Sequence, residues 1–269
     1  MSDTIDLPEQ NTYQVFSEGT ATGNLATIFH SESDTPSILS AEDKTVLCEL
    51  ASDTLTICHL NQTTQNLSMA CFNQSGEIQR CGHGALAAGA HLDRKVFLQS
   101  ETALNFANGQ FSLRKHRDCY WFSSDTDIQI TAENCLFATE LVHHRILETA
   151  TSMGESGYLI VRLSDDTDLR QVQPNLNLLK QSTKRALILT SAQLSQPDID
   201  YQIRYFAPQY GVIEDSATGS ANEIAAYFWH EKINLADMRC YQASEAGGCI
   251  YINYAENRLW VGGKVRQLG

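Results

Sequence analysis

Two stretches made almost entirely of small residues constrain the fold of this chain more than any other feature of its sequence. The first is CGHGALAAGA at 81–90, and the second is DSATGSANEIAA at 215–226. A helix of glycine, alanine and serine carries little side-chain bulk, so other backbone segments can approach it closely on every side. We therefore expect each stretch to form a helix in the middle of a curled sheet.

The predicted elements around these stretches come in one order, and this order occurs twice along the chain. Alternating or continuous apolar runs, typical of strands, precede and follow each stretch, and further helices are predicted upstream of each. Upstream of the first is SAEDKTVLCELAS, with Ser40 as N-cap, and upstream of the second are CLFATELVHH at 135–144 and LNLLKQS. The strand patterns of the first half are DTLTICHL, LSMACFN, ALNFAN, QFSLRKH and CYWFSS, and those of the second are GYLIVRL, RALILTS, YQIRYFAP, GCIYINYA and RLWVGGKV. Such duplication indicates two similar lobes.

We predict an α+β fold with two pseudo-symmetric lobes, each a curled β-sheet or barrel around a central helix. Residues 1–122 form the N-terminal lobe and residues 123–269 the C-terminal lobe, with the polar segment 123–134 as linker and the last strand able to return to the first lobe. Clefts between lobes are favoured ligand sites, so we expect the functional site there.

The composition excludes several classes of partner. A net charge of −13, with basic clusters no longer than RKHR at 114–117, argues against nucleic acid, because phosphate binding needs a concentrated basic surface. No apolar run approaches the roughly 20 residues that span a bilayer, so we expect no membrane partner. The acidic N-terminus lacks the pattern of a secretory signal, and we predict a cytoplasmic protein.

The eight cysteines are scattered, with no C-x-x-C pair and no histidine at zinc-finger spacing. This spacing favours reduced, mostly buried thiols and predicts no metal site. The cysteines are Cys48, Cys58, Cys71, Cys81, Cys119, Cys135, Cys240 and Cys249.

The N-termini of the two small-residue helices carry the candidate chemistry. Backbone N–H groups at a glycine-containing helix N-terminus bind a carboxylate without any basic side chain. The first brings Cys81 and His83, and the second brings Glu214, Asp215 and Ser220. Structural roles are the alternatives: a core histidine, acids that cap the second helix, and a small serine for close packing. Cys81 and His83 are two residues apart on one helix, so we expect them not to face each other and not to form a nucleophile–base dyad. A small buried hydrophobe is the simpler role for Cys81.

The two helix stretches also resemble a known family. CGHGALAAGA and APQYGVIEDSATGSANEIAAYFW, with YQVF and the Gly23-Asn24 turn near the start, are similar to the PhzF-like family of phenazine biosynthesis, which is related in fold to diaminopimelate epimerase. The similarity continues through YQASEAGG and LWVGGKVRQ. It implies two pseudo-symmetric lobes with the active site between them, no metal or organic cofactor, a homodimer, and a substrate carboxylate bound at the helix N-termini.

The resemblance also implies roles for individual residues. The family's proton-transferring carboxylate comes from a Ser-Glu-Thr motif, and the matching stretch here is Ser52-Asp53-Thr54, where an aspartate replaces the glutamate. Its side chain is shorter by one methylene, and a displacement of about 1 Å at such a site costs around a hundredfold in rate. The resemblance thus assigns catalysis to Asp53, His83 and Asp215, and substrate binding to Gly82, Gly219, Ser220 and Ser52.

We therefore predict a cofactor-independent isomerase that moves a proton within a small carboxylate-bearing molecule, for example a cyclic one. Two alternatives stay open. One is an amino-acid epimerase or racemase, although a two-thiol mechanism is disfavoured because the second helix N-terminus has Asp215 where such enzymes have a cysteine. The other is a catalytically decayed small-molecule-binding protein, for which the aspartate at position 53 is the chief argument.

Overall fold

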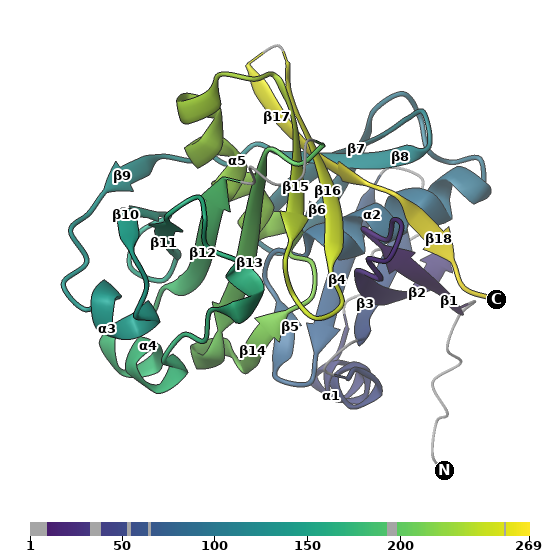
Figure 1. Ribbon diagram of the computed structural model, residues 1–269. Coiled ribbons are helices and arrows are strands. Elements are labelled where there is room, and N and C mark those ends of the chain that lie inside the picture. Colours follow the sequence, from purple (N-terminus) through teal and green to yellow (C-terminus); the bar gives the residue numbers. More distant parts are fainter. Residues whose placement is uncertain (1–9, 33–38, 53–54, 64–65, 193–197, 256) are drawn as a thin grey trace. The chain divides into compact units, whose positions relative to one another are not determined.

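A computed structural model describes residues 10–32, 39–52, 55–63, 66–192, 198–255 and 257–269 (Figure 1). The chain divides into two compact units. The N-terminal unit comprises Met1–Val15, Asn24–Asp125 and Lys264–Gly269, and the C-terminal unit comprises Phe16–Gly23 and Thr126–Gly263.

The N-terminal unit contains one sheet, paired in the order β18-β1-β2-β3-β4-β6-β7-β8, with β5 also against β4. The β2–β3 and β4–β6 pairs are parallel, and the others are antiparallel. The strands are β1 (Gln10–Val15), β2 (Asn24–Glu32), β3 (Leu55–Gln62), β4 (Leu67–Asn73), β5 (Gly76–Ile78), β6 (Thr102–Phe106), β7 (Gly109–His116), β8 (Cys119–Ser124) and β18 (Val265–Gln267).

The C-terminal unit repeats this topology in the order β9-β10-β11-β12-β13-β15-β16-β17, with β14 also against β13. Here β11–β12 and β13–β15 are the parallel pairs, at the positions equivalent to those of the first unit. The strands are β9 (Ile130–Ala132), β10 (Ile146–Ser152), β11 (Tyr158–Leu163), β12 (Ala186–Ala192), β13 (Tyr201–Ala207), β14 (Val212–Asp215), β15 (Asp237–Gln242), β16 (Gly248–Ala255) and β17 (Arg258–Gly263). The predicted internal duplication is present in the strand pairing of the two units.

Helices occupy equivalent places in the two units. The helix α1 connects β2 to β3 as α4 connects β11 to β12, and α2 and α5 follow β5 and β14. At α1 the predicted cap is present, because the Ser40 hydroxyl accepts from the Asp43 N–H and the Asp43 carboxylate accepts from the Ser40 N–H. The helices are α1 (Ala41–Leu50), α2 (Gly82–Arg94), α3 (Ala138–Val142), α4 (Leu176–Ser182) and α5 (Gly219–Ile233), with 3-10 turns at Leu169–Gln171 and Pro208–Tyr210.

The two small-residue helices form the cores of their units. Every residue of α2 from Gly82 to Leu92 is buried, and the helix packs against β1 and β2 and also against β7 and β8 near the other end of the sheet. The sheet therefore curls around the helix, as the small side chains predict. In the second unit α5 packs against β9, β11, β12, β13, β16 and β17. There Tyr201 stacks on Trp229, whose indole N–H donates to Thr190.

The sequence patterns missed some elements. The polar segment 123–134 contains the short strand β9, and neither β10 nor β15 was predicted. The helix expected over 135–144 is only α3, which ends where His143 takes the left-handed conformation (φ 50°). Among the helices in the described ranges, none has the length and apolar character needed to cross a membrane.

Candidate active site

Within the N-terminal unit, Cys81 is the N-cap of α2. Its backbone is extended (φ −111°, ψ 91°), and its side chain makes no capping hydrogen bond. The first N–H groups of a helix have no partner inside the helix, and they carry its partial positive charge. With Gly82 as the first helical residue, this N-terminus has the character of a carboxylate-binding site.

The imidazole of His83 is held from two strands. Its Nε2 lies 2.9 Å from the Thr56 hydroxyl of β3, and its Nδ1 lies 3.4 Å from the amide nitrogen of Asn24 at the start of β2. Because an amide nitrogen only donates, Nδ1 is the acceptor, and the ring proton is on Nε2, which donates to Thr56. The predicted candidate is thus a buried histidine with one favoured tautomer.

Contrary to the expectation from the sequence, Cys81 and His83 are in contact. The Cys81 Sγ lies 3.7 Å from Nε2 and 3.9 Å from Nδ1 of the ring. The prediction was wrong because Cys81 is the extended N-cap and not a helical residue, so the rule for residues two apart on a helix does not apply to it.

Cys81 also belongs to a buried cluster with Cys58 of β3 and Cys71 of β4. These two face each other in the antiparallel pair, with their sulfurs 2.6 Å apart. Burial raises the pKa values of the Cys58 and Cys71 thiols, whereas hydrogen bonds from Cys58 and then Cys71 lower the pKa of Cys81 well below its usual range. Of the three thiols, Cys81 is therefore the one most readily deprotonated, because its neighbours stabilise the thiolate.

Asp53, the predicted proton-transfer residue, lies outside the described residues, as does Thr54. The residues on either side are described. Ser52 and Leu55 exchange two backbone hydrogen bonds of 3.1 and 3.2 Å, so the chain is tied on both sides of position 53. From Leu55 the chain runs directly into β3, which carries Thr56, the hydrogen-bond partner of His83.

In the C-terminal unit, the two predicted acids do not cap α5. Asp215 ends β14, and the N-cap is Thr218, three residues later. The first turn of α5 contains no acid. The carboxylate of Asp215 accepts a 2.6 Å hydrogen bond from the Thr218 hydroxyl. The Glu214 carboxylate instead forms a bidentate ion pair with the Arg204 guanidinium, with N–O distances of 2.7 and 2.8 Å. The capping prediction was wrong because three residues, 216–218, separate Asp215 from the first residue of the helix.

A buried glutamine that the sequence did not single out holds this turn. The Gln242 Oε1 accepts from the Thr218 N–H at 2.7 Å, and its Nε2 donates to the Asp215 carbonyl at 2.6 Å. Gln242 has no exposed surface. The turn leads directly into the buried residues Gly219 and Ser220, the first two of α5. The motif YQAS contains Gln242, but nothing in its spacing indicates the contact.

The comparison with known proteins decides the family. The model of the PhzC-PhzF family of phenazine biosynthesis-like proteins matches residues 13–265. This chain belongs to that family. A relative, an uncharacterised isomerase of Halalkalibacterium halodurans, is 26% identical over 197 residues, which cover 73% of this chain and 74% of the relative.

Solved structures agree with this PhzF-family assignment. A putative phenazine biosynthesis PhzC/PhzF protein from Clostridium difficile superposes with a TM-score of 0.78 at 20% identity, over 97% of this chain and 96% of the other. A hydroxyproline epimerase from Agrobacterium vitis, with bound trans-4-hydroxy-L-proline, gives a TM-score of 0.58 at 8% identity, over 97% and 91%. At these identities the likeness concerns the fold alone. The predicted two-lobed, epimerase-like α+β fold is confirmed.

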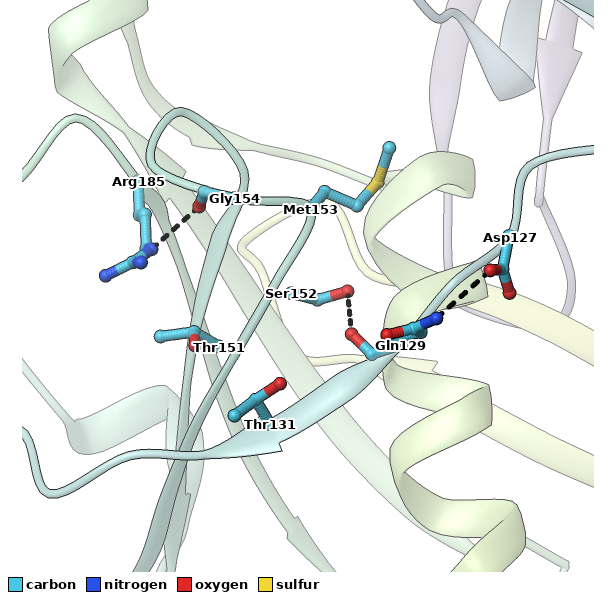
Figure 2. A pocket seen from close by; sticks show the side chains of 8 residues that line it. All are labelled: Asp127, Gln129, Thr131, Thr151, Ser152, Met153, Gly154 and Arg185. Carbon is cyan, nitrogen blue, oxygen red and sulfur yellow. Dashed lines mark hydrogen bonds between the residues drawn. The ribbon is translucent and has the colours of Figure 1, made fainter.

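A pocket of about 350 Å³ in the C-terminal unit contains none of the PhzF-family residues predicted for the site. Figure 2 shows its polar groups largely engaged with one another: Ser152 donates to the Gln129 carbonyl, Gln129 donates to Asp127, and Arg185 donates to the Gly154 carbonyl. The groove lies beside β9 and β10, and hydrogen bonds within the groove already engage several of its polar groups. Its lining is Asp127, Gln129, Thr131, Thr151, Ser152, Met153, Gly154 and Arg185.

Proposed function

We propose that this PhzF-family protein is a cofactor-independent isomerase that moves a proton within a small carboxylate-bearing molecule. Family membership and the isomerase relatives support the reaction class. The observation that carries the proposal is the state of His83, a buried imidazole with one favoured tautomer beside a helix N-terminus without a side-chain cap. An imidazole in a defined tautomer can donate and accept a proton at known atoms.

In the proposed reaction Asp53 removes the proton from one carbon and an acid returns it to another. His83, in the first turn of α2, relays or orients the proton through its Nε2–H. Asp215, at the end of β14, has the same proposed role from the C-terminal unit. Its hydrogen bond from Thr218 restricts where the carboxylate can point. Both residues are candidates for contact with the reacting atoms.

The substrate carboxylate is proposed to bind to backbone N–H groups, with Gly82 on one helix and Gly219 and Ser220 on the other, and with Ser52 beside the acid/base residue. This mode of binding needs no basic side chain. It is therefore compatible with a chain whose net charge is −13. We also propose that the protein acts as a homodimer, which light scattering of the purified protein would test.

The test is proton NMR in D2O with a panel of cyclic and amino-acid carboxylates, including a dihydro-hydroxy-anthranilate. We expect one compound to isomerise with deuterium uptake, and we expect the reaction to disappear in Asp53→Ala and Asp53→Asn. His83→Gln and Asp215→Asn should slow it without unfolding the protein, as judged by circular dichroism. Full activity of Asp53→Asn would refute the assigned acid/base.

The same spectra separate the alternatives. Exchange confined to a stereocentre, with the carbon skeleton unchanged, would indicate an epimerase. Line broadening without any conversion would indicate a protein that binds carboxylates only. Asp53→Glu tests the meaning of the shorter side chain: a faster reaction points to a weakened enzyme, and a slower one to a pocket built around aspartate.

A further inference from the structure

The sulfurs of Cys58, Cys71 and Cys81, the thiol cluster, lie closer together than the packing of buried cysteines requires. Its three Sγ atoms all lie within 4.8 Å of one another. The residues are 0%, 2% and 5% exposed, so the sulfurs are held away from water. They come from three elements, β3, β4 and the N-cap of α2, and the sheet and helix bring them together.

Gly84, in the first turn of α2, is what allows the sulfurs to gather. A Cβ at this position would lie 2.7, 2.8 and 2.8 Å from the sulfurs of Cys71, Cys58 and Cys81. All three sulfurs are thus nearly equidistant from one point beside the helix backbone. A helix N-terminus stabilises negative charge, and thiolates are the form of cysteine that binds metals.

We propose that Cys58, Cys71 and Cys81 bind one thiophilic divalent ion, zinc, as a structural site that ties β3 and β4 to the N-terminus of α2. On binding one Zn²⁺ the three thiols would release three protons to the solvent, and the three thiolates with the ion would carry a net charge of −1 beside the positive end of the helix. The chain's cysteine spacing predicted no metal, because these residues are far from the C-x-x-C pattern. The proposal goes beyond the isomerase function, which requires no metal.

The sulfur positions need one adjustment to hold zinc. With Zn–S bonds of about 2.3 Å, sulfurs in a tetrahedral site lie about 3.8 Å apart. The Cys58–Cys71 separation of 2.6 Å would have to widen by roughly 1 Å, which side-chain rotation supplies. The proposed protein ligands are the three thiolates alone, and a solvent molecule takes the fourth position. His83 is not among the ligands, because Thr56 and Asn24 already engage both of its ring nitrogens.

A redox pair is the competing interpretation, since Cys58 and Cys71 face each other. It accounts for two sulfurs only. The third, on Cys81, makes hydrogen bonds with both of the others. A three-sulfur arrangement is typical of a metal-binding site rather than of a single disulfide.

The test uses the full chain, reduced under anaerobic conditions and refolded from urea with and without zinc, because the site is closed in the folded protein. Native mass spectrometry counts bound metal, and cobalt substitution gives a sulfur-to-cobalt absorption band if thiolates are ligands. The variants are Cys58→Ala, Cys71→Ala and Cys81→Ala. The matched control is Cys240→Ala, which removes an equally buried cysteine from the other unit.

We expect one zinc per chain in the wild type and in the control, with a higher Tm when zinc is present and a cobalt–thiolate band. Cys81→Ala should lose the bound zinc, the zinc-dependent rise in Tm and the cobalt–thiolate band. It removes a sulfur at the helix N-cap and not within the sheet, so of the three variants it is the one that we most expect to fold. Three results would overturn the proposal. Cys81→Ala could bind the metal as well as the wild type does, the wild type could bind no metal under any loading condition, or a Cys58–Cys71 disulfide could persist in reductant. None of these readouts depends on isomerase activity, so this proposal and the proposed function can fail separately.

Discussion

Adding one methyl group at Gly84 should destabilise the N-terminal unit, whereas the same change at Gly89, in the same helix, should not. The Cβ of Gly84→Ala would lie 2.7–2.8 Å from three sulfurs, at least about 0.6 Å closer than ordinary contact near 3.4 Å. At Gly89 the nearest atoms are those of Tyr120 at 3.7 Å and Leu113 at 3.9 Å, which are ordinary contacts.

The magnitudes follow from two opposing effects. Overpacking a core by a methyl group costs about 1–3 kcal/mol, and replacing a helical glycine with alanine gains up to about 1 kcal/mol. The net expectation is a loss of about 1–2 kcal/mol for Gly84→Ala and a gain of up to about 1 kcal/mol for Gly89→Ala. The two variants should therefore differ by roughly 1–3 kcal/mol in the free energy of unfolding.

Hydrogen exchange at increasing urea, read by mass spectrometry of peptides from α2, measures this free energy for the N-terminal unit alone. The protein should be reduced and metal-free, so that only packing is compared. If Gly84→Ala is as stable as Gly89→Ala, the sulfurs do not pack against the first turn of the helix. In that case the geometric basis of the zinc proposal also fails.

Three further predictions concern single contacts. Arg204→Ala should lower the free energy of unfolding by roughly 3–5 kcal/mol in urea titrations, because it leaves the carboxylate of Glu214 without its mostly buried partner; Glu214→Gln should cost clearly less, and equal losses would contradict this account. Gln242→Leu should lower the free energy of unfolding by about 1–3 kcal/mol for each buried backbone group left unpaired. It should also speed hydrogen exchange in the turn before α5, and unchanged exchange there would show that the glutamine does not hold the turn. Hydrogen bonds with Ser40 lower the pKa of Asp43 below the ordinary 3.8, so its stabilisation is present above that value and is lost as the pH falls through the lower folded-state pKa. Asp43→Ala should therefore be less stable than the wild type at neutral pH, and the difference should vanish as acid protonates the carboxylate. A difference that persists in acid would count against the cap.

The parts of the fold that could be predicted are those with a local signal. Small residues at 81–90 and 215–226 indicate closely packed helices, and alternating apolar residues indicate strands such as β3, β4 and β16. The strand β10 (ILETATS in the sequence) mixes polar and apolar residues without a regular period, and β15 (DMRCYQ) alternates only over its first four residues, too short a run to be recognised. They are strands because β10 is paired on both sides, with β9 and β11, and β15 with β13 and β16. Such pairing is decided by tertiary structure.

For the site, the sequence identified positions but not their partners. His83 was predicted from the helix motif, whereas its contacts with Asn24 and Thr56 join segments 59 and 27 residues away. The thiol cluster was missed for the same reason, because distant strands supply two of its three sulfurs. The capping role of Glu214 and Asp215 was wrong because residue order alone does not show how many turn residues precede a helix.

The duplicated topology explains how one fold can host different chemistries at its two helix N-termini. Strand pairing and helix placement are the same in both units, so each presents backbone N–H groups at an equivalent point of its own sheet. Only the side chains there differ: thiols and an imidazole at α2, and carboxylate, hydroxyl and amide groups at α5. The backbone geometry is common to both units, so the side chains beside it can differ while the fold stays the same. A family built on this plan can therefore change its reaction by substituting side chains such as Cys81, His83 or Asp215, which is why membership alone leaves the substrate to experiment.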